Sequence, residues 1–281
     1  MSRKGSSLVD PELIGQPAGG HNQPSHNGRL IVNADDWGRD RQTTERTLEC
    51  AKCGAISSVS AMVFMDDSER AAAIAVERGI DAGLHLNFTT AFSASGIPAR
   101  LSDNQRRLSE YLRRRRWAQA VFHPGLVRCF EYVVAAQREE FHRLYGRAPD
   151  RLDGHHHMHL CANVLFGGLL PPGTAVRRNF SFQPGEKSFT NRFYRQIVDR
   201  VLAPHHRLTD FFFSLHPLEP TGRLQRIFDL SRQFVVEVET HPYEPAEYSF
   251  LTGGGISKLG GNCPVAPRFD IGLAKTYDRA S

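Results

Sequence analysis

The sequence predicts an α/β domain with a parallel sheet, because of two patterns. Short apolar runs alternate with amphipathic stretches from residue 29 onward, which is typical of βαβ units whose strands run parallel. Polar residues gather directly after several apolar runs, at the strand ends where α/β barrels and open sheets place their sites. No internal repeat and no linker follow residue 28, so we expect one domain over residues 29–281.

The order of the elements follows from the spacing of apolar residues. Strands are expected at residues 30–34, 56–65, 80–86, 150–153, 175–178, 211–215 and 234–240. Helices are expected at residues 43–53, 67–78, 126–145, 190–202 and 221–229. Gly54 and Gly79 are the expected C-caps of the first two helices. Residues 90–108, which are rich in Ser, Pro and Gly, are expected to be irregular.

Composition excludes several classes of protein. A chain of 281 residues with 40% hydrophobic side chains can bury roughly 75% of its unfolded surface. No apolar run approaches the roughly 20 residues of a membrane span. Residues 1–28 are polar and lack the apolar stretch of a secretory signal, so we expect a disordered leader. Five cysteines without regular spacing predict no disulfide framework and favour a cytoplasmic location.

The positive charge has one local concentration. The formal net charge is +5, and Arg113, Arg114, Arg115 and Arg116 lie in a row beside Trp117. Such a run can bind nucleic acid or another anion. Because no nucleic-acid motif accompanies the run, we interpret it as a solvated helix face and expect no nucleic-acid partner.

Acidic and histidine residues follow four of the predicted strands. The acid pair Asp35 and Asp36 follows the first strand, and six of the 13 histidines fall at other strand ends. These histidines are His85, His155, His156, His157, His159 and His241. A carboxylate with two imidazoles is a common set of ligands for a divalent cation. A second carboxylate can act as general base and a further histidine as general acid, which together suffice to hydrolyse an amide or ester.

These segments also resemble a known family. Four segments are similar, in the same order, to motifs of the YdjC-like carbohydrate deacetylases: LIVNADDWG (30–38), GLHLN (83–87), LDGHHHMHL (152–160) and THP (240–242). That family includes chitooligosaccharide deacetylases and a hopanoid-biosynthesis branch. The resemblance spans roughly residues 29–251 and implies an irregular, TIM-barrel-like (β/α) barrel with its site at the C-terminal strand ends. It also implies metal-dependent removal of acetyl from an N-acetylated sugar, either an oligosaccharide or a glycolipid.

The resemblance assigns roles residue by residue. Asp36, His85 and His155 match the family's ligands for one divalent cation, either Mg²⁺ or Zn²⁺. Asp35 matches the catalytic base, and His241 matches a late histidine that acts as general acid or orients another group. The sequence departs most from the family at residues 89–122, which help to line the substrate cleft in the family.

The remaining polar residues of the motifs have supporting roles. By the resemblance His156, His157, His159 and Asn87 lie behind the ligands or face the substrate. Asp153 is well placed to hold an imidazole in its metal-binding tautomer. The geometry of the histidine cluster stays open. An extended segment would put His155 and His157 on one face, whereas a helical segment would put His155 and His159 there.

Two other functions are compatible with these residues. One is a single-metal phosphoesterase, or another amidohydrolase, on the same barrel. The other is a non-enzymatic protein that binds metal or nucleic acid through the histidine cluster and the arginine run. We predict no membrane span, and we leave a homodimer open.

Overall fold

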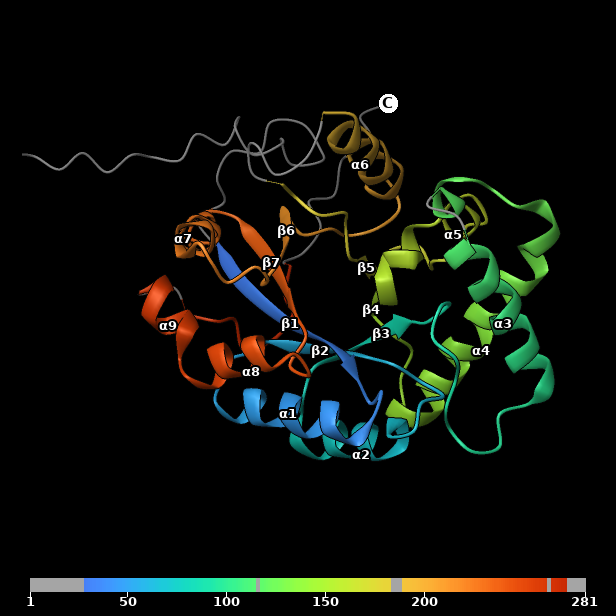
Figure 1. Ribbon diagram of the computed structural model, residues 1–281, viewed down its shortest axis with the longest axis horizontal. Helices are drawn as coiled ribbons and strands as arrows, with labels where there is room; N and C mark the ends of the chain where they lie inside the picture. Colours follow the sequence, from blue (N-terminus) through green and yellow to red (C-terminus); the bar gives the residue numbers. More distant parts are fainter. Residues whose placement is uncertain (1–27, 115–116, 183–188, 262–263, 272–281) are drawn as a thin grey trace, which may run out of the picture.

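The computed structural model describes residues 28–114, 117–182, 189–261 and 264–271 of the chain. Within these residues seven parallel strands form one curled sheet, in the order β5-β4-β3-β2-β1-β7-β6, and helices surround its outer face (Figure 1). The predicted α/β barrel class is confirmed. The predicted leader, apart from Gly28, lies outside the described residues, as do Arg115 and Arg116.

The strands lie where the apolar runs place them. The strands are β1 (Arg29–Trp37), β2 (Ser58–Ala61), β3 (Ala82–Leu86), β4 (Arg151–Gly154), β5 (Ala175–Val176), β6 (Phe211–Ser214) and β7 (Val235–Thr240). The helices that match the predicted ones are α1 (Arg41–Lys52), α2 (Ser68–Arg78), α4 (Val127–Tyr145), α6 (Phe189–Leu202) and α7 (Thr221–Leu230). Short helices α5 (Ala162–Phe166), α8 (Pro245–Thr252) and α9 (Gly255–Gly260) add to them.

The expectation of an irregular segment at residues 90–108 is wrong in its second half. Helix α3 (Ala99–Arg114) begins directly after Pro98, and it buries Leu101, Gln105, Leu108 and Leu112. These four side chains recur every three or four residues and therefore form one face of a helix. The many charged residues between them concealed this period. Arg113 and Arg114 are exposed at the end of the helix, as expected for a solvated face.

The two edges of the curled sheet are joined by irregular segments. Ala175 of β5 forms a parallel bridge with Arg207, which precedes β6. Farther along, the backbone N–H of Ser181 donates to the carbonyl oxygen of Phe212 in β6 at 2.7 Å. Among the described residues these contacts join the two edges without a regular eighth strand, and the segment that follows β5 borders the carboxyl end of the sheet.

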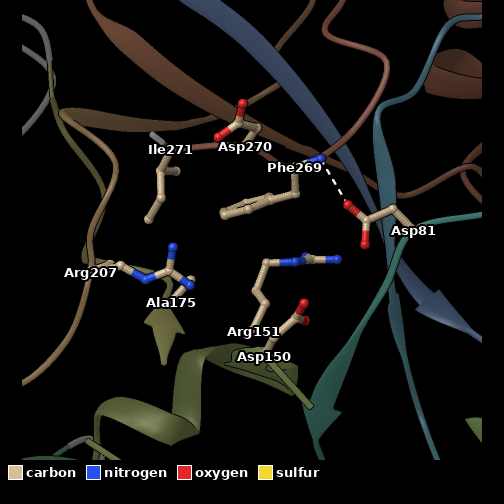
Figure 2. Close-up of a pocket in the computed structure, with 8 residues that line it drawn as sticks. All are labelled: Asp81, Asp150, Arg151, Ala175, Arg207, Phe269, Asp270 and Ile271. Atoms are coloured by element: carbon tan, nitrogen blue, oxygen red, sulfur yellow. Dashed lines mark hydrogen bonds between the residues drawn. The ribbon is translucent and has the colours of Figure 1, made fainter. Parts of the chain in front are cut away.

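The amino ends of the strands are covered by residues 264–271. Val265 bridges to Leu30, and the ring of Phe269 lies 4.5 Å from the guanidinium of Arg151. Figure 2 shows the small cavity that remains there; its lining contains acids and arginines but no histidine. The candidate metal ligands lie at the opposite, carboxyl end. Among the described helices, none combines the length and the apolar character needed to cross a bilayer.

Gly154 allows β4 to pass close to the turn that follows it. A Cβ atom at this position would lie 3.0 Å from both the backbone nitrogen and the Cβ of His159. We predict that Gly154→Ala lowers the free energy of unfolding by about 1–3 kcal/mol in chemical denaturation, because the crowded turn must shift. The matched control is Gly222→Ala in α7, where the added Cβ meets only the flexible end of Arg226 at 3.7 Å. An unchanged stability of Gly154→Ala would show that the turn is loosely packed.

Candidate active site

A bulge at the end of β1 turns two adjacent acids toward the same place. Neighbouring residues of a regular strand point to opposite faces of the sheet. In β1 the register with β2 shifts between Ala34 and Trp37, and Asp36 has a positive φ of 65°. Both Asp35 and Asp36 are buried, and both carboxylates lie beside His85 of β3. The bulge thus supplies two carboxylates to one site, as bulges beside active sites often do.

Three ligand atoms converge at Asp36. Its Oδ1 lies 2.9 Å from Nδ1 of His155 and 3.3 Å from Nε2 of His85. Oδ1 is buried, yet it forms no aligned hydrogen bond with a described residue. The two imidazoles hold the pKa of Asp36 well below its usual range although burial opposes this, so the carboxylate is ionised. An ionised oxygen and two ring nitrogens facing one another without hydrogen-bond alignment fit a divalent cation.

His85 is held in place by its other nitrogen. Nδ1 lies 2.8 Å from Oδ1 of Asp153 in β4, so a proton on Nδ1 leaves the lone pair of Nε2 for a ligand. Burial disfavours the charged imidazole, but Asp35 and Asp153 outweigh burial and raise the pKa of His85 to about 10. The surrounding negative charge thus attracts either a proton or a cation to Nε2.

Asp35 is held by a buried arginine. The Arg177 guanidinium donates from Nη1 to Oδ2 at 2.6 Å and from Nη2 to Oδ1 at 2.8 Å. The Asn33 side-chain amide also donates to Oδ1, at 2.8 Å. Burial would raise the pKa of Asp35, but the guanidinium lowers it below its ordinary value. The carboxylate is therefore ionised at neutral pH and fixed in one orientation.

Arg177 was not among the predicted site residues. Besides Asp35, its guanidinium contacts three further carboxylates, at 3.0 Å for Asp153, 2.7 Å for Glu237 and 3.4 Å for Glu239. Two signals could have revealed this cluster. Arg177 directly follows β5, and β7 alternates valine with glutamate, which places both glutamates on the interior face.

The four histidines after β4 adopt neither of the two expected arrangements. The segment forms two short helical turns with a kink, because His156 and His157 have positive φ values of 55° and 57°. Positive φ is costly for residues other than glycine and often marks a functional site. As a result only His155 of this cluster joins the ligand group with Asp36.

His157 and His159 lie on the side of the cluster that faces Arg177. Nε2 of His157 is 3.6 Å from Oε2 of Glu239. His159 is fully buried, and its Nε2 lies 2.9 Å from the carbonyl oxygen of Arg177. Burial lowers the pKa of His159 to about 3, so the ring is neutral and donates this hydrogen bond. His159 therefore supports the backbone that carries Arg177.

His156 and Asn87 lie on the opposite side, at the loop after β3. Nδ1 of His156 is 2.9 Å from the hydroxyl of Thr89, and burial together with neighbouring His155 lowers the pKa of His156 to about 4. The Asn87 side chain accepts from the backbone N–H of Thr90 at 2.9 Å and donates to its carbonyl at 2.7 Å. Asn87 thus folds the loop that holds Thr89 against the neutral imidazole.

His241 follows β7 and lies among acids. Its backbone N–H donates at 2.7 Å to Glu247 of α8, which also accepts from the hydroxyl of Thr240 at 2.6 Å. Burial lowers the pKa of His241, but Asp35 and Glu239 outweigh it and raise the pKa above the usual value. The acids therefore favour the protonated form of the imidazole.

Comparisons with known sequences identify the family of this chain. The family model described as YdjC-like protein matches residues 29–249. A chitooligosaccharide deacetylase from Proteus mirabilis is 32% identical over 48% of this chain and 52% of its own length. One from Serratia marcescens is 32% identical over 62% of this chain and 72% of its own. The chain thus spans about half the length of the first of these relatives and nearly three quarters of the second.

A solved structure shares the fold. It is an Enterococcus faecalis protein described as a candidate for cellobiose-phosphate cleavage, with a TM-score of 0.60 and 18% identity. The match covers 85% of this chain and 96% of that one. The family model covers most of the chain, which confirms the resemblance to this family. The chain therefore belongs to the YdjC-like protein family.

Proposed function

We propose that this chain is a carbohydrate deacetylase, which uses a divalent cation to remove acetyl from an N-acetylated amino sugar of an oligosaccharide or glycolipid. The observation that carries the proposal is the convergence of Asp36 Oδ1, His85 Nε2 and His155 Nδ1 without hydrogen-bond alignment. The names of the relatives, chitooligosaccharide and carbohydrate deacetylase, support the choice of substrate.

Asp36, His85 and His155 would hold the cation. One oxygen and two ring nitrogens suit Zn²⁺, whereas Mg²⁺ prefers oxygen ligands and would keep several waters. A bound cation supplies Lewis-acid chemistry: it acidifies water and polarises a carbonyl oxygen. Asp153 fixes the ring of His85 for this purpose through the 2.8 Å contact with Nδ1.

Asp35 would act as the general base. A base must be ionised before it accepts a proton, and Arg177 keeps this carboxylate ionised and oriented. Asp35 borders the ligand group. One of its carboxylate oxygens lies within 4.8 Å of a ring nitrogen of His85 and of a carboxylate oxygen of Asp153. A carboxylate oxygen of Asp35 would take one proton from the water that attacks the acetyl carbonyl.

His241 would act as the general acid. Deacetylation breaks the bond between the carbonyl carbon and the sugar nitrogen, and the nitrogen needs a proton to leave as an amine. Nearby acids raise the pKa of His241 and so favour its protonated form. After this proton transfer the products are acetate and the free amino sugar.

The charge distribution favours this function over a phosphoesterase that binds several metal ions. A second candidate group, Asp35 with His85 and Asp153, also has ligand geometry. Both of its carboxylates are already paired with Arg177, at 2.6 Å for Asp35 and 3.0 Å for Asp153. The described residues thus favour one cation per chain. The cytoplasmic location and a homodimer stay predictions.

Removing the cation tests its role. We predict that a chelator abolishes acetate release from N-acetylglucosamine oligomers, and that one equivalent of Zn²⁺ or Mg²⁺ per chain restores it. Asp36→Asn should lose both the bound cation and at least about 100-fold in activity, since the substitution removes a charged ligand. The measurements are metal content and acetate release.

Two control variants separate the roles in this experiment. Asp35→Asn, one residue away, should keep the cation and lose about 10²–10⁴-fold in kcat, because only the base is removed. Asp103→Asn, at an exposed acid of α3, should change neither quantity. Full activity of Asp36→Asn, or activity that resists chelation, would rule out the metal role.

The pH profile tests the role of His241. A general acid acts in its protonated form, so activity falls as the pH rises through its pKa. Since that pKa is raised from 6.5, we predict an alkaline limb in kcat that lies above pH 6.5. His241→Ala should lower kcat by about 10²–10⁴-fold and remove this limb. An unchanged alkaline limb in His241→Ala would assign the acid to another group.

A further inference from the structure

Four large apolar side chains are exposed on two neighbouring segments of the chain. One segment is the turn after α3, which contains the short helix η2 (Ala118–Ala120), and the other is α5. The exposed fractions of these side chains are 76% for Trp117, 70% for Phe166, 55% for Val121 and 41% for Phe122. Single exposed apolar residues are common, but a group of them on one surface marks a contact with another molecule or a membrane.

Hydrogen bonds hold the two segments side by side. The Tyr111 hydroxyl of α3 donates to the carbonyl oxygen of Val121 at 2.8 Å, which fixes the turn against the helix. The side chain of Asn163 in α5 accepts from the backbone N–H of His123 at 2.9 Å and donates to the carbonyl oxygen of His123 at 3.0 Å. Helix η2 also packs against both α3 and α5, which lies beside the end of α3 (Figure 1). The apolar side chains therefore belong to one fixed surface.

Positive charge borders these apolar side chains. Arg113 and Arg114 are exposed in the last turn of α3, directly before the turn. The sequence has no acidic residue at positions 111–130, and positions 160–176, which include α5, carry no charged residue at all. The surface thus has a basic part at the end of α3 and an uncharged, apolar part at α5. We call it the α3–α5 face; it consists of Arg113, Arg114, Trp117, Val121, Phe122 and Phe166.

The α3–α5 face lies at the same end of the barrel as the candidate active site. The Ser109 hydroxyl of α3 donates to the carbonyl oxygen of Thr89 at 2.8 Å, and the hydroxyl of Thr89 lies 2.9 Å from Nδ1 of His156. Helix α5 begins two residues after the turn of histidines ends at Leu160. Both helices of the face are therefore attached to segments that carry site residues.

We propose that the α3–α5 face binds the surface of a lipid bilayer that contains anionic lipids. Tryptophan is favoured at the boundary between headgroups and acyl chains, where one part of the ring is apolar and the N–H stays hydrated. Val121 and Phe166, which carry no polar side-chain group, suit the acyl boundary, and Arg113 beside them suits the negative headgroups. This inference does not rest on the proposed function. Binding would hold the carboxyl end of the barrel at the lipid surface.

The layout of the α3–α5 face favours a bilayer over a nucleic acid or a second copy of the chain. A nucleic acid carries a phosphate at every nucleotide and is bound by cations along the contact, but α5 has none. A two-fold contact between copies would bring two sets of arginines into one interface, and the face has no acid to pair them. A bilayer matches both the apolar and the basic part.

Tryptophan fluorescence tests the proposal directly. The chain has two tryptophans, of which Trp37 is fully buried and Trp117 is exposed, so a change of emission on binding reports Trp117. We predict that vesicles of equal parts phosphatidylglycerol and phosphatidylcholine sediment with the protein and shift its emission to shorter wavelength. Vesicles of phosphatidylcholine alone, or high salt, should weaken binding at least about 10-fold. Trp117→Phe should remove the shift and keep vesicle binding.

Variants of each part of the α3–α5 face have matched controls on α2, which lies elsewhere on the barrel (Figure 1). The double variant Arg113→Gln, Arg114→Gln should weaken binding to the anionic vesicles about 25-fold, at about 5-fold for each arginine. Phe166→Ser should weaken it about 10-fold, since an inserted ring is lost. Arg78→Gln and Val76→Ser change exposed residues of α2 and should leave vesicle binding unchanged.

The other outcomes overturn the proposal. No vesicle binding by the wild type contradicts it, and so does vesicle binding that every variant of the α3–α5 face retains in full. An emission shift that grows with protein concentration in the absence of vesicles, together with a dimer in ultracentrifugation, would assign the face to a second copy. A shift caused by a single-stranded oligonucleotide but not by vesicles would assign it to nucleic acid. Acetate release is not needed for any of these measurements, so its absence contradicts only the deacetylase function.

Discussion

The buried guanidinium of Arg177 compensates the negative charge of the carboxylates inside this barrel. Four carboxylates lie within 3.4 Å of it, those of Asp35, Asp153, Glu237 and Glu239. Among the described residues, Arg177 is the largest charged side chain that is fully buried. Carboxylates so close together cannot all ionise without a compensating charge. Removing one partner of such a buried pair typically costs 3–5 kcal/mol. The same contacts orient Asp35 and Asp153, so stability and chemistry depend on one side chain.

The negative charge that Arg177 leaves uncompensated accounts for the other groups of the site. With Asp36 there are five acidic side chains in this cluster, whereas three arginines contact them: Arg177, Arg151 and the partly exposed Arg39, which lies 3.3 Å from Oδ2 of Asp36. Burial raises the pKa of Glu237, and nearby acids raise the pKa of His85 and of His241. The excess negative charge therefore attracts protons to these groups, and it equally favours a divalent cation beside Asp36.

Much of this organisation could be predicted from the sequence. The strands follow from apolar runs, and the carboxyl ends of parallel strands meet, so the acid pair, His85 and the histidine cluster could be placed at one end of the sheet. The choice of Asp36, His85 and His155 as ligands came from the resemblance to the family. Arg177 was missed: its place after β5 and the alternating glutamates of β7 point to a buried cation, but its pairing with Asp35, 142 residues away, depends on the closed sheet. The kink at His156 was equally hidden, since a positive φ outside glycine depends on the packing around it. Helix α3 was missed for another reason: charged residues masked its apolar period.

We propose that Asp36, His85 and His155 hold a divalent cation. Anomalous diffraction from crystals grown with Zn²⁺, measured on both sides of the zinc absorption edge, tests it most directly. One peak bonded to the Asp36 carboxylate, Nε2 of His85 and Nδ1 of His155 is the result that we predict. A peak on His157 or His159, or the absence of a peak within reach of Asp36, would show that these three residues do not hold the cation.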